Sequence, residues 1–223
     1  MKTKIKISPE QSLAQYIDHT VLRPDTTNAM VAQLCQEALQ HRFAAVCVPP
    51  CFVKQAVAAL QDSGVQVATV VGFPLGYQLA KVKFFEAHQA LSEGATEIDV
   101  VMNIAAFKSG KYEEVVSELH ELSTLCHFKN AILKVIIETA LLSEEEIMKA
   151  CEICTEAEAD YVKTSTGFAA TGAQMEDVLL MRANLPQHIK IKASGGIKTK
   201  EAALALVNAG ADRIGTSSGV SLL

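Results

Sequence analysis

Two lysines in the last third of the chain have the setting of a nucleophilic site. Lys163 lies in DYVKTSTGF and Lys192 in IKIKASGGI, and in both segments an apolar run leads into the lysine and small polar residues with glycine follow it. A lysine held at a strand end beside a second ammonium group can lose its proton and attack a carbonyl carbon. The pair therefore favours an active site built on lysine chemistry over a surface charge patch.

Asp99, in EIDVV, is a third ionisable residue at the end of an apolar run. Two lysines and one carboxylate carry an excess positive charge, which is costly to bury unless one lysine is neutral. Lowering a lysine pKa from about 10.4 to about 7 corresponds to about 4 kcal/mol, which desolvation and a neighbouring ammonium can together supply. The alternative is a set of buried ion pairs that fixes strand register.

Glycine and hydroxyl residues follow the last two apolar runs, in SGG (194–196) and GTSSG (215–219). Backbone amides and hydroxyls of such loops can surround an anion, and phosphate sites of α/β barrels lie at this position. Each segment could also form an ordinary tight turn. Two such loops at the phosphate position of one fold favour a phosphate site.

Short runs rich in valine and isoleucine alternate with segments of helical period along the whole chain. Eight strands, each followed by a helix, predict a single-domain (β/α)₈ barrel over residues 1–223, with residues 1–12 as an N-terminal extension or helix. A doubly wound open sheet is the alternative. The predicted strands are YIDHT (16–20), AAVCV (44–48), VQVATVV (65–71), TEIDVVM (96–102), AILKVII (131–137), DYVKTS (160–165), IKIKAS (189–194) and DRIGTS (212–217).

The barrel gives a reason for the three ionisable residues to meet, since catalytic groups gather at the carboxyl ends of barrel strands. Side chains alternate between the two faces of a strand. If Asp99, Lys163 and Lys192 point inward, the residues two positions earlier point inward too, and the sequence predicts a polar barrel interior. Those residues are Glu97, Tyr161 and Lys190.

The composition argues against several classes of function. With 223 residues, a net charge of −5 and a pI near 5.7, the chain has no electrostatic footprint for nucleic acid or an anionic membrane. No apolar run is long enough to span a bilayer and no signal peptide is evident, so a cytoplasmic protein is expected. The glycine fingerprints of dinucleotide and nucleoside triphosphate sites are absent from the sequence.

Other reactive side chains are expected to be structural. The six cysteines are expected to be reduced and mostly buried, and CEIC (151–154) lies within a predicted helix, where neither zinc nor a redox pair is expected. His19 would face away from the neighbouring Asp18 on a strand and is expected to be structural. Cys47 is expected near the pocket mouth, where it would not act as a nucleophile.

Six motifs spread over essentially the whole chain resemble the deoxyribose-phosphate aldolase family: YIDHTVLRPD, VVGFPLG, EIDVVMN, YVKTSTGF, KASGGI and RIGTSSGV. The resemblance implies a class I, Schiff-base aldolase of deoxynucleoside catabolism. Such an enzyme reversibly joins acetaldehyde to glyceraldehyde 3-phosphate, giving 2-deoxyribose 5-phosphate, and needs neither a metal nor an organic cofactor. Its partners would be these small molecules and further copies of the chain, in a homodimer or larger homo-oligomer.

The resemblance also implies roles for individual residues. Lys163 matches the Schiff-base lysine, Lys192 the second lysine that tunes it, and Asp99 the acid/base that works with water. Asp18 matches a residue near the sugar hydroxyls, and Thr166 and Gly167 would line the substrate site. The residues that would hold the phosphate are Gly195, Gly196, Gly215, Ser217 and Ser218.

The chain departs from some members of that family at two places. Phe168 stands where some relatives have a phosphate-binding lysine, so phosphate binding is expected to depend more on backbone amides. The chain ends in Ser221-Leu222-Leu223, without the terminal tyrosine that assists proton transfer in some relatives. Two alternative functions keep the barrel: a metal-free phosphosugar isomerase or epimerase, which needs no Schiff-base lysine, and a non-catalytic phosphometabolite-binding protein.

Overall fold

The computed structural model describes residues 12–223. Except for Ser12, the N-terminal extension predicted over residues 1–12 lies outside the described residues. A 3₁₀ turn, Leu13–Tyr16, leads directly into the first strand.

Eight parallel strands form a closed barrel in chain order, with the last strand paired to the first. The predicted (β/α)₈ barrel is thereby confirmed, and the open doubly wound sheet is wrong. All eight predicted strands are present, each shorter than its apolar run. They are β1 (Ile17–Thr20), β2 (Ala45–Val48), β3 (Gln66–Val71), β4 (Glu97–Val101), β5 (Ile132–Ile136), β6 (Tyr161–Lys163), β7 (Lys190–Ser194) and β8 (Arg213–Thr216).

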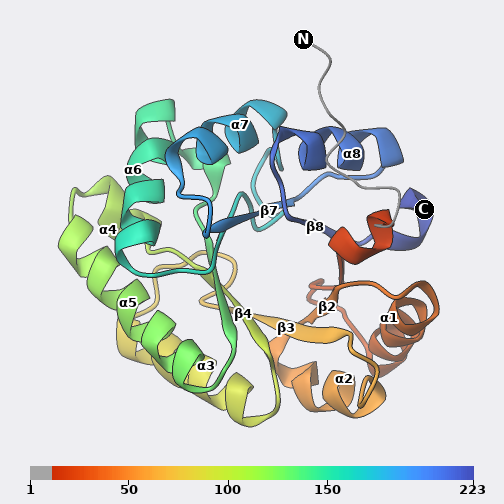
Figure 1. Ribbon diagram of the computed structural model, residues 1–223. Coiled ribbons are helices and arrows are strands. Elements are labelled where there is room, and N and C mark those ends of the chain that lie inside the picture. Colours follow the sequence, from red (N-terminus) through yellow and green to blue (C-terminus); the bar gives the residue numbers. More distant parts are fainter. Residues whose placement is uncertain (1–11) are drawn as a thin grey trace.

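Helices form a ring around the barrel (Figure 1). One helix or a pair of helices connects each strand to the next, and a short 3₁₀ segment, Gly219–Leu222, follows β8. None of the helices in residues 12–223 combines the length and apolarity that a bilayer crossing requires. The helices are α1 (Asn28–His41), α2 (Val53–Ala59), α3 (Ala80–Ser92), α4 (Ile104–Lys108), α5 (Tyr112–Phe128), α6 (Glu144–Glu156), α7 (Met175–Asn184) and α8 (Lys200–Ala209).

Several helices begin at side chains that satisfy their free backbone amides. Thr27 and Thr199 accept hydrogen bonds from the first turns of α1 and α8. Ser143 and Glu146 form a reciprocal capping box at the start of α6. Such caps are each worth about 1 kcal/mol and fix the residue at which the helix starts. The loops that precede these helices, at the carboxyl ends of the strands, therefore have defined lengths.

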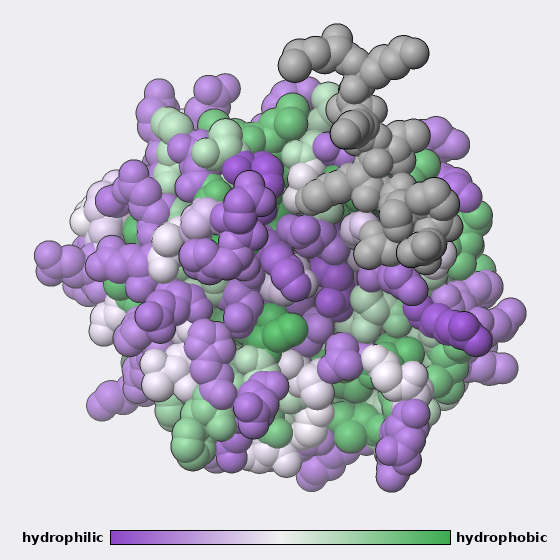
Figure 2. Space-filling view, in the orientation of Figure 1, coloured by the Kyte–Doolittle hydropathy of each residue, from purple (hydrophilic) through white to green (hydrophobic). Residues whose placement is uncertain are grey.

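The apolar core lies in the shell between the strands and the surrounding helices. Outward-facing strand residues such as Val46, Ile98 and Leu133 are fully buried there. The face of the molecule drawn in Figure 2 is largely hydrophilic, with hydrophobic side chains in small patches between the polar ones. Because the apolar core lies outside the barrel, the barrel interior can hold polar groups.

The cysteines match their expected burial. All six are free, and five of them are buried; Cys51 is exposed. Cys151 and Cys154 lie within α6. Cys47 differs from its expectation, because it is fully buried inside the barrel beside Ala68 and does not reach a pocket mouth.

Candidate active site

Among residues 12–223, seven acidic and basic side chains fill the barrel interior, each from a strand and each buried. Three are carboxylates and four are basic. They come from six strands. Residues two apart on a strand face the same side, and the closed barrel gathers the inward-facing sides around one axis. They are Asp18, Glu97, Asp99, Lys134, Lys163, Lys192 and Arg213.

Asp99 contacts all three lysines of this cluster. Its Oδ2 accepts hydrogen bonds from Nζ of Lys163 and Nζ of Lys192, both at 2.8 Å. Its Oδ1 accepts one from Nζ of Lys134 at 2.7 Å. The structure therefore brings together the three residues that the sequence singled out, Asp99, Lys163 and Lys192, and adds a fourth.

The remaining contacts extend the cluster across the barrel. Lys192 also pairs with Oδ2 of Asp18, and Nε of Arg213 donates to Oδ1 of Asp18 at 2.6 Å. Nη2 of Arg213 lies 3.1 Å from Oε2 of Glu97, and that oxygen lies 2.5 Å from Nζ of Lys134. Every carboxylate of the cluster thus contacts at least two basic groups, whereas Lys163 contacts only one carboxylate.

The lysines therefore differ in the number of carboxylates around them, and this difference sets their pKa values apart. Burial lowers the pKa of Lys163 below its ordinary value; the Asp99 carboxylate opposes the shift and the Lys192 ammonium adds to it. Burial acts on Lys192 in the same direction, but Asp18 and Asp99 outweigh it and raise the pKa of Lys192. Lys163 is therefore the lysine that gives up its proton most readily.

Charge balance leads to the same conclusion. With all groups ionised the cluster has four positive and three negative charges, and a neutral Lys163 makes it balanced. Burial opposes ionisation of Asp99, but Lys134, Lys163 and Lys192 hold the pKa of its carboxyl group well below the ordinary value. A neutral amine beside an ionised carboxylate is the pair that imine formation with proton transfer requires.

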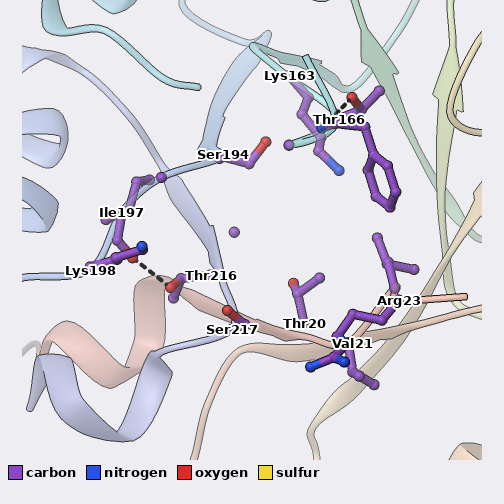
Figure 3. Close-up of a pocket in the computed structure, with 16 residues that line it drawn as sticks. Thr20, Val21, Arg23, Lys163, Thr166, Ser194, Ile197, Lys198, Thr216 and Ser217 are labelled. Atoms are coloured by element: carbon purple, nitrogen blue, oxygen red, sulfur yellow. Dashed lines mark hydrogen bonds between the residues drawn. The ribbon is translucent and has the colours of Figure 1, made fainter. Parts of the chain in front are cut away.

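A cavity of about 320 Å³ lies above this cluster, at the carboxyl ends of β1, β6, β7 and β8. The Lys163 amine points into it, while Ser194 borders it from the end of β7 and Ser217 from the loop after β8 (Figure 3). Its charged lining residues are all basic. The lining comprises Thr20, Val21, Leu22, Arg23, Lys163, Thr166, Gly167, Phe168, Ser194, Gly195, Gly196, Ile197, Lys198, Gly215, Thr216 and Ser217.

Most of the predicted substrate and phosphate residues lie in this lining; Asp18 and Ser218 do not. Asp18 lies two residues before Thr20 on β1, where Lys192 and Arg213 occupy its carboxylate. Asp18 thus forms ion pairs beneath the cavity, and its expected contact with the sugar stays a prediction. Ser218 lies just beyond the lining, where its backbone N–H donates to Oγ1 of Thr216 at 2.9 Å.

Gly215 shows why glycine is needed at the end of β8. A Cβ atom at this position would lie 2.8 Å from Cβ of Ser194 and 3.0 Å from Cε of Lys192. Any larger residue would therefore push the second lysine away from Asp99. Gly195 is needed for its conformation, since its φ of 89° is one that other residues rarely adopt.

Glu138, which the sequence analysis missed, holds the loop that follows Lys163. Its buried carboxylate accepts hydrogen bonds from the backbone N–H of Thr166, at 3.2 and 3.3 Å, and from the Thr166 hydroxyl. Oγ1 of Thr166 in turn accepts from the N–H of Phe168 at 3.0 Å. The hydroxyl proton of Thr166 is thus donated to Glu138. Thr166 can therefore line the substrate site only as a hydrogen-bond acceptor or through van der Waals contact.

The alternation argument gives mixed results. Glu97 and Tyr161 are buried in the barrel as expected. Lys190 is exposed, because it is the first residue of its strand and lies at the opposite rim, with its Nζ 5.5 Å from the centre of the Tyr161 ring. The same argument could have found Lys134, which interrupts the apolar run ILKVII, and Arg213 at the start of β8.

His19 faces away from the cluster, as expected. Its Nε2 lies 2.6 Å from Oε2 of Glu37 on α1, and its ring packs against Phe43. These contacts lie between β1 and its helix, outside the barrel. His19 therefore stabilises the packing of that helix and does not reach the cavity.

Comparisons with known proteins agree with this geometry. Residues 12–223 match the model of the DeoC/LacD family aldolases. A deoxyribose-phosphate aldolase of Caldicellulosiruptor saccharolyticus is 51% identical, over 96% of this chain and 98% of that protein. One of Thermococcus gammatolerans is 52% identical, over 95% of each chain.

Two solved structures share both fold and sequence with the chain. A structure described as QR15, an aldolase, is 46% identical, with a TM-score of 0.90 over 94% of this chain and 93% of that one. The deoxyribose phosphate aldolase of Aeropyrum pernix, described as having a unique tetrameric structure, is 36% identical, with a TM-score of 0.88 over 94% of this chain and 88% of that one. The chain belongs to the DeoC/LacD family of aldolases.

Proposed function

We propose that the protein is a class I aldolase that reversibly cleaves 2-deoxy-D-ribose 5-phosphate to D-glyceraldehyde 3-phosphate and acetaldehyde. The observation that carries the proposal is the amine of Lys163, which borders the cavity and belongs to a buried cluster that has one excess basic group. Relatives about 50% identical over nearly the whole chain are named deoxyribose-phosphate aldolase, which supports this substrate.

The reaction begins at the aldehyde carbon of the open-chain sugar. The neutral Lys163 amine attacks that carbon to form a carbinolamine, which loses water to give an iminium ion. The C2–C3 bond then breaks: its electrons move toward the iminium to form an enamine, and the C3 hydroxyl loses its proton as glyceraldehyde 3-phosphate forms. Protonation of the enamine and hydrolysis release acetaldehyde and restore the amine.

Asp99 and Lys192 are proposed to move protons during these steps. Asp99 is held as a carboxylate by the basic groups around it, and Lys192 keeps its proton because Asp18 and Asp99 raise its pKa. Together with a water molecule they form an acid/base pair beside Lys163. The raised pKa of Lys192 argues against a role for it as the nucleophile.

The substrate phosphate is proposed to bind to the loops after β7 and β8. Support comes from a lining in which every charged side chain is basic, although the whole chain carries a net charge of −5. Backbone amides of glycine loops suit phosphate oxygens, because they approach closely and carry partial positive charge. The proposed phosphate residues are Gly195, Gly196, Gly215, Ser217 and Ser218.

We further propose that the protein acts as a homodimer or larger homo-oligomer. The exposed apolar side chains of Leu79, Val82 and Phe85, spaced three residues apart at the start of α3 and along it, support an association surface.

The nucleophile is tested by reduction with sodium borohydride in the presence of 2-deoxyribose 5-phosphate or acetaldehyde, followed by intact mass and peptide mapping. We expect a reduced adduct on Lys163. Lys163→Leu should lose both adduct and turnover yet keep its melting temperature, because the change removes the excess basic group. Lys190→Gln, at the opposite end of the barrel, is the matched control and should retain both.

An absent adduct in a protein that still binds the phosphosugar would contradict the proposed mechanism. It would favour an isomerase or a phosphometabolite-binding barrel, neither of which needs an imine. Appreciable aldol activity in a folded Lys163→Leu variant would equally remove the proposed role of this lysine.

A further inference from the structure

Two basic side chains in the cavity lining, Arg23 and Lys198, take no part in the buried cluster. Both are exposed and approach the cavity from different loops, Arg23 after β1 and Lys198 after β7. Figure 3 shows them on different sides of the cavity, with Arg23 beside Thr20. Arg23 lies in the motif YIDHTVLRPD, but the sequence analysis assigned it no role.

The pairing of β1 with β8 puts Arg23 near the proposed phosphate loop. His19 lies opposite Thr216 in this pairing, so the segments that follow both strands leave the barrel side by side. Arg23 and Ser217 line the cavity together and also line a neighbouring groove against α1. A phosphate group bound by the loop after β8 would therefore lie within reach of an arginine from the loop after β1.

The contacts of Arg23 are those of a guanidinium that can change partners. It makes a two-point contact with Asp25, with Nε–Oδ1 at 2.9 Å and Nη2–Oδ2 at 2.6 Å. Both side chains are about two-thirds exposed, at 69% and 65%. An exposed ion pair of this kind contributes little free energy. The same planar fork of donors binds a phosphate group equally well.

The turn that carries Arg23 is held independently of this pair. The backbone carbonyl of Arg23 accepts hydrogen bonds from the N–H of Thr26 at 3.1 Å and from its hydroxyl at 2.6 Å. The backbone can therefore stay in place while the side chain moves. The loop after β6 offers no charge at position 168. Phe168 borders the cavity there, and its ring packs edge-on against Phe73, with the ring centres 5.3 Å apart.

We propose that Arg23 determines specificity for phosphorylated substrates by exchanging Asp25 for the substrate phosphate. Asp25 holds the guanidinium at the cavity edge in the free protein and competes with the phosphate for it. This inference rests on the proposed function, because it assigns a further residue to the phosphate end of the same site. It also predicts that substitutions of Arg23 and of Asp25 change KM for the phosphosugar in opposite directions.

The test compares KM for 2-deoxyribose 5-phosphate with KM for unphosphorylated 2-deoxyribose. Loss of an exposed charge pair with the phosphate should raise KM of Arg23→Gln for the phosphosugar about fivefold, and leave KM for the free sugar and kcat for both unchanged. Asp25→Asn should lower KM for the phosphosugar about twofold, because the competing exposed pair is weak. In the Arg23→Gln background, Asp25→Asn should have no effect on either constant.

Lys149→Gln and Glu152→Gln serve as matched controls. Lys149 and Glu152 form an exposed ion pair on α6, outside the cavity lining. Lys149→Gln changes the net charge as Arg23→Gln does, and Glu152→Gln changes it as Asp25→Asn does, without touching the site. Both should leave KM at the wild-type value. The proposal would be overturned if Arg23→Gln changed KM equally for both sugars or for neither. It would also be overturned if Asp25→Asn still lowered KM in the Arg23→Gln background.

Failure of the proposed function has a separate signature. If the wild-type protein turns over neither sugar and forms no borohydride adduct, the aldolase assignment fails whatever Arg23 does. Calorimetric titration with glycerol 3-phosphate then tests Arg23 alone. Weaker binding by Arg23→Gln and tighter binding by Asp25→Asn would support its contact with phosphate, whereas unchanged affinities would refute it.

Discussion

Lys163 and Lys192 carry the same side chain and contact the same oxygen of Asp99, yet they differ in proton affinity. The difference arises from Asp18, which pairs with Lys192 and not with Lys163. A second carboxylate offsets the desolvation of Lys192, whereas Lys163 shares its single carboxylate with two other ammonium groups. One buried aspartate therefore decides which lysine becomes the nucleophile.

Replacing Lys192 should change the pH dependence of the reaction. Lys192→Met removes a positive charge beside Lys163, so the pKa of Lys163 rises toward its ordinary value. Because the neutral amine predominates only above that pKa, the acidic limb of the kcat/KM profile should move to higher pH by about one unit or more. Lys192→Arg keeps the charge and should shift the limb less.

The measurement is kcat/KM against pH for the three proteins, with far-UV circular dichroism as the control for folding. A folded Lys192→Met variant whose acidic limb coincides with that of the wild type would show that Lys192 does not tune the nucleophile. Its remaining role would then be to transfer protons.

At the scale of elements, the segment that follows β5 holds the loop that follows β6. The N–H of Ile137 donates to the carbonyl of Lys163 at 3.0 Å, and the N–H of Thr139 donates to that of Thr164 at 2.9 Å. Between them Glu138 reaches across to Thr166. The loop that carries Thr166 and Gly167 is therefore held in place by the segment after β5.

Glu138→Ala should loosen this loop. It leaves the N–H and hydroxyl of Thr166 without their acceptor, and lost hydrogen bonds to a charged group cost about 2 kcal/mol. We expect a lower free energy of unfolding and a higher KM for the phosphosugar, with the borohydride adduct still on Lys163. Glu138→Gln keeps one acceptor oxygen and should recover part of both losses.

The measurements are urea unfolding and steady-state kinetics on the two variants. A wild-type KM together with a wild-type unfolding midpoint in Glu138→Ala would show that the loop keeps its position without this carboxylate. An equal loss in Glu138→Gln and Glu138→Ala would assign the effect to the charge and not to the hydrogen bonds.

At the scale of the whole molecule, the buried cluster ties the two ends of the chain together. Arg213 on the last strand pairs with Asp18 on the first, and with Glu97 from the middle of the chain. These contacts lie across the closure of the barrel between β8 and β1. Removing one partner from such a buried pair leaves an uncompensated charge, which costs more than the pair itself contributes.

Arg213→Met should therefore destabilise the protein by about 3–5 kcal/mol, the range for a broken buried ion pair. Arg23→Gln is the matched control, because it breaks an exposed arginine–aspartate pair and should change stability by less than about 1 kcal/mol. Urea denaturation at neutral pH measures both free energies. Equal, small losses in the two variants would mean that solvent or rearranged lysines compensate the carboxylates left by Arg213.

Local patterns in the sequence predicted the eight strands, their order and the meeting of Asp99 with Lys163 and Lys192. This was possible because alternation along a strand and helical period between strands are properties of neighbouring residues. The inward orientation of Lys163 and Lys192 was inferred from the tendency of catalytic groups to gather at the carboxyl ends of barrel strands. The glycine and serine segments after β7 and β8 were recognisable because backbone anion sites need those residue types.

The tertiary structure decided which charges pair. Asp99 meets Lys192 across 93 residues, and Asp18 meets Arg213 across 195. Only barrel closure brings these residues together, so no local pattern could show that Asp18 is committed to an ion pair or that Glu138 holds the loop after β6. The sequence determined which residue types could do the chemistry. The fold decided, through burial and the number of carboxylates around each amine, that Lys163 is the one that loses its proton.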